Sequence, residues 1–246
     1  MRVAILGYGN LGWNLEKQLT NSGVEVSQIF TNDTSSSVTF QRLDQLDPRT
    51  ELLFVCKSDS LISSALESLS ETDLNSSCIV AHTSGSVSLQ NSRFRDAVFY
   101  PFQTFIKEYR ANWNGVPVFI ETEIEEVKSI LSEIAMKIDC FANELNSDQR
   151  KRLHIAGVFS SNFPNHLIRL MFDYLKASHL ESELIKPLLT EAVRKSFDLG
   201  PKLAQTGPAV RGDDNVIKDH LKLLKEDPEL HALYTMFTDG IQNAKQ

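Results

Sequence analysis

Short apolar runs alternate with polar, helix-compatible stretches over residues 1–120. This alternation is typical of βα units that build a mostly parallel sheet. The run Leu52–Cys56 is apolar at every position, which indicates a strand covered by helices on both faces. The pattern predicts strands at Arg2–Leu6, Glu25–Phe30, Leu52–Cys56, Cys78–His82, Ala97–Tyr100 and Val116–Ile120.

Beyond Glu121 the apolar residues recur with the period of a helix. Segment Glu125–Ile138 places its apolar residues on one helical face, and from Ser147 onward strand signals are rare. We therefore predict an α/β domain with a doubly wound sheet over residues 1–146 and an all-helical domain over residues 147–246. The second domain is expected to contain helices at 148–177, 181–198, 213–226 and 228–243, separated by Gly200-Pro201, Gly207-Pro208 and Asp227-Pro228.

Residues 7–12 read G-Y-G-N-L-G, a G-x-G-x-x-G string that follows the first predicted strand and opens a predicted helix. In such a string the first glycine permits a tight turn, the second lets the backbone approach a diphosphate, and the third lets helix and strand pack closely. The amides of the first helical turn then face the anion. We therefore predict a Rossmann-like dinucleotide site, with a glycine-rich turn that binds nothing as the alternative. The expected contacts are Gly7, Gly9, Asn10, Leu11 and Gly12.

The end of the second predicted strand bears on which dinucleotide binds. NAD sites usually place an acidic residue about 20 positions beyond the glycine string, where it bonds the ribose. Here Thr31 and Asn32 are neutral donors that suit a 2′-phosphate. Asp33 would repel that phosphate if it pointed inward, although a turn aspartate can equally point to solvent. We expect NADP(H) as the cofactor and keep NAD(H) as the alternative.

Polar residues also follow the later strands, where a doubly wound sheet places its ligand. Their hydroxyl and amide groups can bond ribose and nicotinamide, and capped loops are the alternative interpretation. The expected cofactor contacts at these strand ends are Cys56, His82, Thr83, Ser84 and Gln103.

A polar stripe runs along the otherwise apolar segment Leu153–Leu167. Ser161 and Asn165 fall within about 20° of His154 on a helical wheel, and Asn162 and His166 lie further round. Buried polar groups need a partner, water or a ligand, so this stripe indicates either a substrate pocket or a structural polar network. Pro164 is expected to kink or restart the helix, which frees carbonyls near Ser160.

These residue types suggest roles in catalysis. His154 is the first candidate for proton transfer because an ordinary histidine titrates near neutrality, and His166 and His82 are reserves. Asn162 and Asn165 would position a substrate oxygen. Arg211 offers a planar fork for an anionic substituent, with an ion pair to Asp213 or Glu191 as the alternative. The expected catalytic residues are His154, Asn162, Asn165, His166 and Arg211.

Composition narrows the functional classes. The formal net charge is −7, so no basic surface for nucleic acid is indicated, and Arg150–Arg152 is expected to be a solvated helix start. Cys56, Cys78 and Cys140 are far apart and lack nearby Cys or His partners, so we expect reduced thiols and no metal site. No apolar run approaches the roughly 18 residues that span a bilayer, and no signal-peptide core precedes the glycine string. A cytoplasmic location without membrane contact is expected.

The chain carries four distinctive segments in this order: His82–Gly85, Tyr100–Phe105, Leu153–His166 and Gln205–Arg211. Together they resemble a Rossmann-like family whose members are labelled NADP oxidoreductase-like and whose helical half is a domain of unknown function. The resemblance implies an N-terminal NADP-binding domain and a helical domain similar to those of 6-phosphogluconate dehydrogenase and pyrroline-carboxylate reductase relatives. Because those relatives pair through their helical domains, it also implies a homodimer.

Two positions depart from the pattern of such relatives. Asn32 stands where many NADP-binding relatives have an arginine after the second strand. The β-hydroxyacid dehydrogenase relatives use a helix lysine four residues before an asparagine. Here Val158 stands at that distance before Asn162, and Ser161 before Asn165. The lysine mechanism of those enzymes therefore does not transfer to this chain.

We expect an oxidoreductase that passes hydride between NADP(H) and a small carbonyl, imine or hydroxy substrate in the cleft between the domains. The alternative is a non-catalytic NAD(P)-binding sensor or scaffold, because a fold does not dictate chemistry. The missing helix lysine favours that alternative.

Overall fold

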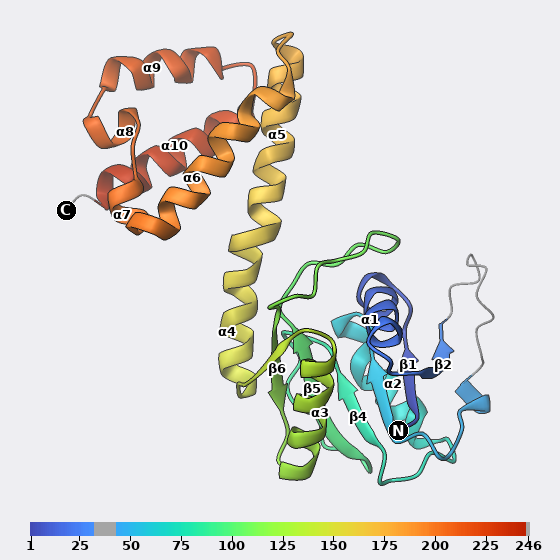
Figure 1. Cartoon of the computed structure of the whole chain (residues 1–246). Coiled ribbons are helices and arrows are strands. Elements are labelled where there is room, and N and C mark those ends of the chain that lie inside the picture. Colours follow the sequence, from blue (N-terminus) through green and yellow to red (C-terminus); the bar gives the residue numbers. More distant parts are fainter. Residues whose placement is uncertain (32–42, 245–246) are drawn as a thin grey trace. The chain divides into compact units, whose positions relative to one another are not determined.

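A mixed sheet forms the core of the first half of the chain in the computed structural model, which describes residues 1–31 and 43–244 (Figure 1). Among these residues the sheet has seven strands in the order β2-β1-β3-β4-β5-β6-β7. Neighbouring strands are parallel except β5 and β6, which are antiparallel. The strands are β1 Val3–Leu6, β2 Val26–Phe30, β3 Leu52–Val55, β4 Ile79–His82, β5 Arg95–Pro101, β6 Pro117–Glu121 and β7 Phe141–Glu144.

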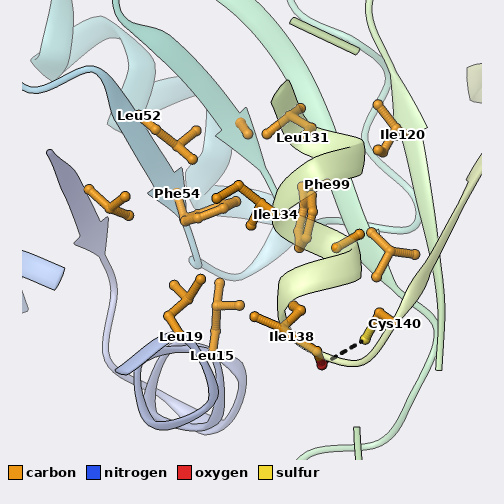
Figure 2. Packing of buried hydrophobic residues seen from close by; sticks show 14 of the residues in the cluster. Leu15, Leu19, Leu52, Phe54, Phe99, Ile120, Leu131, Ile134, Ile138 and Cys140 are labelled. Carbon is orange, nitrogen blue, oxygen red and sulfur yellow. Dashed lines mark hydrogen bonds between the residues drawn. The ribbon is translucent and has the colours of Figure 1, made fainter. Parts of the chain in front are cut away.

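Helices cover both faces of this sheet. Helices α1 (Asn10–Asn21) and α3 (Glu125–Lys137) pack on one face, where their leucines and isoleucines meet Phe54 of β3 (Figure 2). Helix α2 (Ile62–Ser70) packs on the other face, against Leu53 of the same strand. Successive strand residues point to opposite faces, so a strand covered on both sides must be apolar throughout. The predicted doubly wound α/β fold is confirmed.

The strands observed differ from those expected at the far edge of the sheet. Strand β7 was not predicted because it has only four residues, three of them exposed, and no apolar run. The reversal between β5 and β6 also left no pattern in the sequence. Both features lie away from β1, β3 and β4, whose residues are all buried and whose positions were predicted within one or two residues.

The chain divides into two compact units, Met1–Asn162 and Phe163–Gln246. The predicted boundary near residue 146 marks where the chain becomes helical, whereas the units separate after Asn162. Within the described residues from 147 onward no strand occurs. The helices there are α4 Ser147–Gly157, a π-helical turn Val158–Asn162, α5 Phe163–Ala177, α6 Lys186–Leu199, α7 Pro201–Ala204, α8 Pro208–Arg211, α9 Asp214–Leu223 and α10 Pro228–Asn243, with a 3₁₀ turn at Ser182–Ile185.

Helix α4 belongs to the first unit because a buried arginine ties it to the sheet. Arg150 is fully buried, and its guanidinium donates to the Glu121 carboxylate and to the carbonyls of Ser84 and Val87. Glu121 also accepts from the amide and hydroxyl of Ser147, at 2.8 Å each. The prediction that Arg150–Arg152 is solvated was therefore wrong for Arg150, whose distant partner has no local signal in the sequence.

None of the helices in the described part of the chain is long and apolar enough to cross a membrane. The three cysteines are free, with Cys78 and Cys140 buried and Cys56 partly exposed.

Candidate functional site

The turn after β1 requires glycine at two positions. Gly7 has a φ of +107°, and its amide donates to the Phe30 carbonyl at 2.7 Å. A Cβ atom on Gly7 would lie 2.2 Å from the carbonyl oxygen of Cys56, and one on Gly12 would lie 2.0 Å from the carbonyl oxygen of Gly7. Any larger residue would push strand, turn and helix apart.

Gly9 differs from these two glycines because a Cβ there would meet no atom within 4 Å. Gly9 is the N-cap residue of α1, it offers no side-chain cap, and the first turn of the helix contains no acidic residue. The amides at this helix start therefore face open space with a favourable dipole and no competing carboxylate. Residues Gly7–Gly12 thus fit the diphosphate of a dinucleotide, which would occupy the space beside Gly9.

Three other predicted cofactor contacts lie at the same edge of the sheet. The registers of β1, β2, β3 and β4 align Leu6 with Phe30 and Val55, and Val55 with His82. The residues that follow extend the strand pairing by one hydrogen bond each. The Cys56 amide donates to the Leu6 carbonyl at 2.8 Å, and the Thr83 amide donates to the Val55 carbonyl at 3.2 Å. The structure therefore brings Thr31, Cys56 and Thr83 to the carboxyl edge beside the glycine turn. Asn32 and Asp33 lie outside the described residues.

His82 at the end of β4 holds its loop in place. Its Nδ1 accepts from the Ser84 amide at 3.3 Å, so the ring proton is on Nε2, 3.2 Å from the Ser88 carbonyl. Burial of the ring, together with the nearby positive charge of Arg150, lowers the pKa of His82 to about 4. A neutral ring with both nitrogens engaged stabilises the loop and does not favour the reserve role in proton transfer.

Asp59 adds a carboxylate that sequence reasoning did not single out. The Ser84 hydroxyl donates to its Oδ1 at 2.6 Å, and the Ser86 hydroxyl donates to its Oδ2. Burial raises the pKa of this carboxyl, but the hydrogen bonds from the two serines and the charge of nearby His154 outweigh it, so the pKa is lowered. Asp59 therefore remains ionised at neutral pH.

Tyr100 and His154 form a hydrogen-bonded pair although 54 residues separate them in the sequence. Tyr100 lies on β5 and His154 on α4, and the Tyr100 hydroxyl is 3.0 Å from His154 Nδ1. A Cβ atom on Gly85 would lie 2.6 Å from that nitrogen and 2.9 Å from the hydroxyl oxygen, so only glycine fits against the pair. Burial, followed by the charge of Asp59, raises the pKa of Tyr100 to about 12. The Tyr100 hydroxyl therefore stays protonated at neutral pH.

A cavity of about 270 Å³ opens beside this pair, wholly within the first unit. Part of its wall is the π-helical turn Val158–Asn162, which follows α4 and precedes Pro164, where the sequence predicted that the helix would kink or restart. π-Helical turns leave backbone groups outside the regular α-helical pattern and are frequent at functional sites. The cavity is lined by Tyr100, Phe102, Gln103, Thr104, His154, Gly157, Val158, Ser160, Ser161 and Asn162.

The remaining predicted catalytic residues belong to the second unit. Asn165 and His166 are exposed on α5, and His166 Nε2 is 3.1 Å from a carboxylate oxygen of Glu229. Arg211 ends α8, and its Nε donates to Asp213 at 2.7 Å, so the expected alternative ion pair is present. Of the predicted site residues, His154, Asn162 and Gln103 line the cavity of the first unit.

Sequence reasoning missed the residues that act through distant partners. Tyr100, Asp59 and Arg150 each meet the site across a long sequence separation. The sequence did contain one indication that Asp59 could belong to the site. It lies three residues beyond the predicted strand that ends at Cys56, and loops that follow such strands lie at the edge of the sheet where ligands bind.

Solved structures share this arrangement of sheet and helices. An imine reductase from Myxococcus stipitatus in complex with NADP⁺ matches with a TM-score of 0.68 at 13% identity, over 99% of this chain and 94% of that one. The Plasmodium falciparum pyrroline carboxylate reductase with NADP bound matches with a TM-score of 0.57 at 14% identity, over 99% and 97%. At such identities the likeness shows the fold alone, a Rossmann-like sheet followed by helices.

A family model and a solved structure of higher sequence identity indicate the family of this chain. The model for the domain of unknown function DUF2520 matches residues 116–241. A provisionally named NADP oxidoreductase from Bacteroides fragilis is 32% identical, with a TM-score of 0.90 over 98% of each chain. No curated protein matches the sequence. The chain belongs to the DUF2520 family, as the resemblance of the four segments predicted.

Proposed function

We propose that this protein is an NAD(P)-dependent oxidoreductase that transfers hydride to or from a small carbonyl, imine or hydroxy substrate. The observation that carries the proposal is the Tyr100–His154 pair, which lines a cavity. Tyr100 lies on β5, the strand next to β4 in the sheet. A bound nicotinamide would supply the hydride, and the protein must orient the substrate and move one proton.

The pair can deliver that proton by reversing its hydrogen bond. While His154 is neutral, the Tyr100 hydroxyl donates to Nδ1. When His154 is protonated, Nδ1–H donates to the tyrosine oxygen instead, so the tyrosine hydrogen can point to a substrate oxygen or nitrogen. As that hydrogen passes to the substrate, the Nδ1 proton moves to the tyrosine oxygen and His154 becomes neutral. The Asp59 carboxylate interacts favourably with the positive charge on His154. Asn162 and Ser161 line the cavity and would orient the substrate atom.

We further propose NADP(H) as the preferred cofactor. The open space at Gly9 supports a dinucleotide, and the Bacteroides fragilis relative is named an NADP oxidoreductase. Thr31 at the end of β2 suits a 2′-phosphate, and the predicted contact Asn32 follows it. Thermal unfolding with each nucleotide tests this preference, because a ligand at 100 times its Kd stabilises by about 2.7 kcal/mol. A larger shift with NADH than with NADPH would contradict it.

Turnover tests the enzymatic role directly. NADPH oxidation is followed against keto acids, imines and deazaflavins, for the wild type, Tyr100→Phe and His154→Ala. We expect a substrate in this panel, and a loss of rate of about 100-fold or more in each variant because a positioned general acid contributes that much. Tyr109→Phe is the matched control, since Tyr109 is 70% exposed. Full activity of Tyr100→Phe and His154→Ala would remove the pair from catalysis.

The second unit is proposed to hold the substrate and to pair two chains. Asn165, His166 and Arg211 keep their predicted roles toward a substrate oxygen and an anionic substituent. Leu188 and Phe197 on α6 are 71% and 87% exposed, which is unusual for an isolated folded unit and supports a homodimer formed through the helical unit. Light scattering checks this: the wild type is expected as a dimer, and Phe197→Glu as a monomer.

A non-catalytic sensor or scaffold is the second candidate. Neither Val158, four residues before Asn162, nor Ser161, four residues before Asn165, is the lysine that β-hydroxyacid dehydrogenase relatives use at that distance. Nucleotide binding without turnover of any panel compound would favour this candidate. The three free cysteines support a reducing compartment, and we propose a cytoplasmic location for either role.

A further inference from the structure

Lys57 reaches the glycine turn from the neighbouring strand. It follows β3 directly after Cys56, and its Cδ lies 3.3 Å from the position that a Cβ on Gly7 would take. The side chain is partly buried, so its aliphatic stem covers the first glycine of the G-x-G-x-x-G string. The ammonium group is only two bonds beyond Cδ, which keeps it close to this turn.

The ammonium of Lys57 has no counter-ion in the part of the chain that the structure describes. Two other lysines of the first unit have a carboxylate partner: Lys17 pairs with Glu16 at 2.9 Å and Lys128 with Glu125 at 2.7 Å. None of the ion pairs or hydrogen bonds among the described residues involves the Lys57 side chain. A partly buried charge loses part of its hydration, and an anion at the same place would compensate that loss.

The surroundings of the Lys57 side chain favour the binding of an anion. The first turn of α1 has free amides, no acidic residue and no side-chain cap, and the space beside Gly9 is open. We propose that Lys57 binds the diphosphate of the dinucleotide, together with the amides of this turn. The inference rests on the proposed function and deepens it. It also explains how a chain with a net charge of −7 holds a polyanion, since a local cation and aligned amides act at contact distance.

The sheet order decides which phosphate Lys57 meets. Strands β2 and β3 lie on opposite sides of β1. Thr31, the predicted 2′-phosphate contact, follows β2, whereas Lys57 follows β3. Lys57 therefore acts on the diphosphate, which NADPH and NADH share, and not on the 2′-phosphate, which only NADPH carries.

Calorimetric titration of NADPH and of NADH into the full-length protein tests this inference. We expect Lys57→Gln to raise both dissociation constants by the same factor of about ten, which corresponds to about 1.4 kcal/mol. Lys57→Met keeps the stem over Gly7 and is expected to match Lys57→Gln. Lys57→Arg should retain most of the affinity. Lys137→Gln is the matched control, because it removes the same charge from an exposed position at the end of α3.

The outcomes separate this inference from the proposed function. If the wild type binds both nucleotides and Lys57→Gln binds them equally well, the inference is wrong and the proposed function stands. A loss confined to NADPH would assign Lys57 to the 2′-phosphate and would also overturn it. If the wild type binds neither nucleotide, both the inference and the proposed function are wrong. The affinity of the wild type should also fall more steeply with added KCl than that of Lys57→Met.

Discussion

Replacing Arg150 with methionine tests how the first unit holds helix α4, which carries His154. Methionine keeps much of the apolar volume but removes the buried guanidinium. Breaking a buried ion pair by deleting one partner costs about 3–5 kcal/mol, because a charge remains uncompensated. Here the Glu121 side chain is 16% exposed and keeps two hydrogen bonds from Ser147 at 2.8 Å, which places the cost near the lower end. The freed carbonyls of Ser84 and Val87 add to it. We expect a loss of about 3 kcal/mol.

Intrinsic fluorescence measures this loss in the relevant unit alone. Both tryptophans of the chain, Trp13 and Trp113, lie in the first unit, so urea and thermal unfolding followed by tryptophan emission report on that unit. A loss of about 3 kcal/mol lowers the Tm by roughly 6–12 °C for a unit of this size. Arg152→Met is the matched control, because Arg152 is exposed on the same helix, and it should change the free energy of unfolding by less than about 0.5 kcal/mol.

A second variant isolates the charge itself. Arg150→Met combined with Glu121→Gln removes both charges and leaves an acceptor for Ser147. It should recover at least about 1 kcal/mol of the loss, since no unpaired carboxylate remains. Equal stability of Arg150→Met and Arg152→Met would refute the reasoning, as would a double variant less stable than Arg150→Met alone.

Two further predictions concern the glycine turn and His82. Gly9→Ala should fold with unchanged stability and bind NADPH at least about tenfold more weakly, because its Cβ enters the space proposed for the diphosphate. Gly12→Ala should lose about 2 kcal/mol or more of stability, because its Cβ would lie 2.0 Å from the Gly7 carbonyl oxygen. Fluorescence-detected unfolding measures the loss of stability, and NADPH titration measures the loss of binding. The folded-state pKa of His82 is about 4, below the unfolded value of about 6.5, so the unfolded chain binds the proton and stability is lost as the pH falls below 6.5. Between pH 7 and pH 5 the wild type should therefore lose about 2 kcal/mol more than His82→Gln, and equal losses would show that His82 titrates normally.

The sequence predicted most of the fold because the necessary signals are local. Strands β1, β3 and β4 are buried throughout and almost wholly apolar, since helices cover both their faces. Proline and glycine break the later helices where expected. Strand β7 escaped prediction because an exposed edge strand needs no apolar pattern. The glycine string was located correctly at the end of β1.

The candidate site was predicted less completely than the fold. His154, Thr83 and Gly9 were singled out from residue type and position, and the structure places each at the ligand edge of the sheet or in the cavity wall. Tyr100 stood in a segment that the resemblance used, but nothing in the chain indicated that its hydroxyl meets His154. Asp59 was missed because its hydroxyl partners come from the next loop.

The sequence by itself determined most of the order of elements and the position of the glycine turn, because a positive φ, a helix start and a covered strand each impose requirements on a few consecutive residues. Only the tertiary structure decided that Arg150 is buried against Glu121, that Tyr100 bonds His154, and that Lys57 covers Gly7. These contacts join residues far apart in the chain. They depend on which strands and helices come together in the fold. A contact between two distant side chains leaves no periodic pattern in the sequence around either residue.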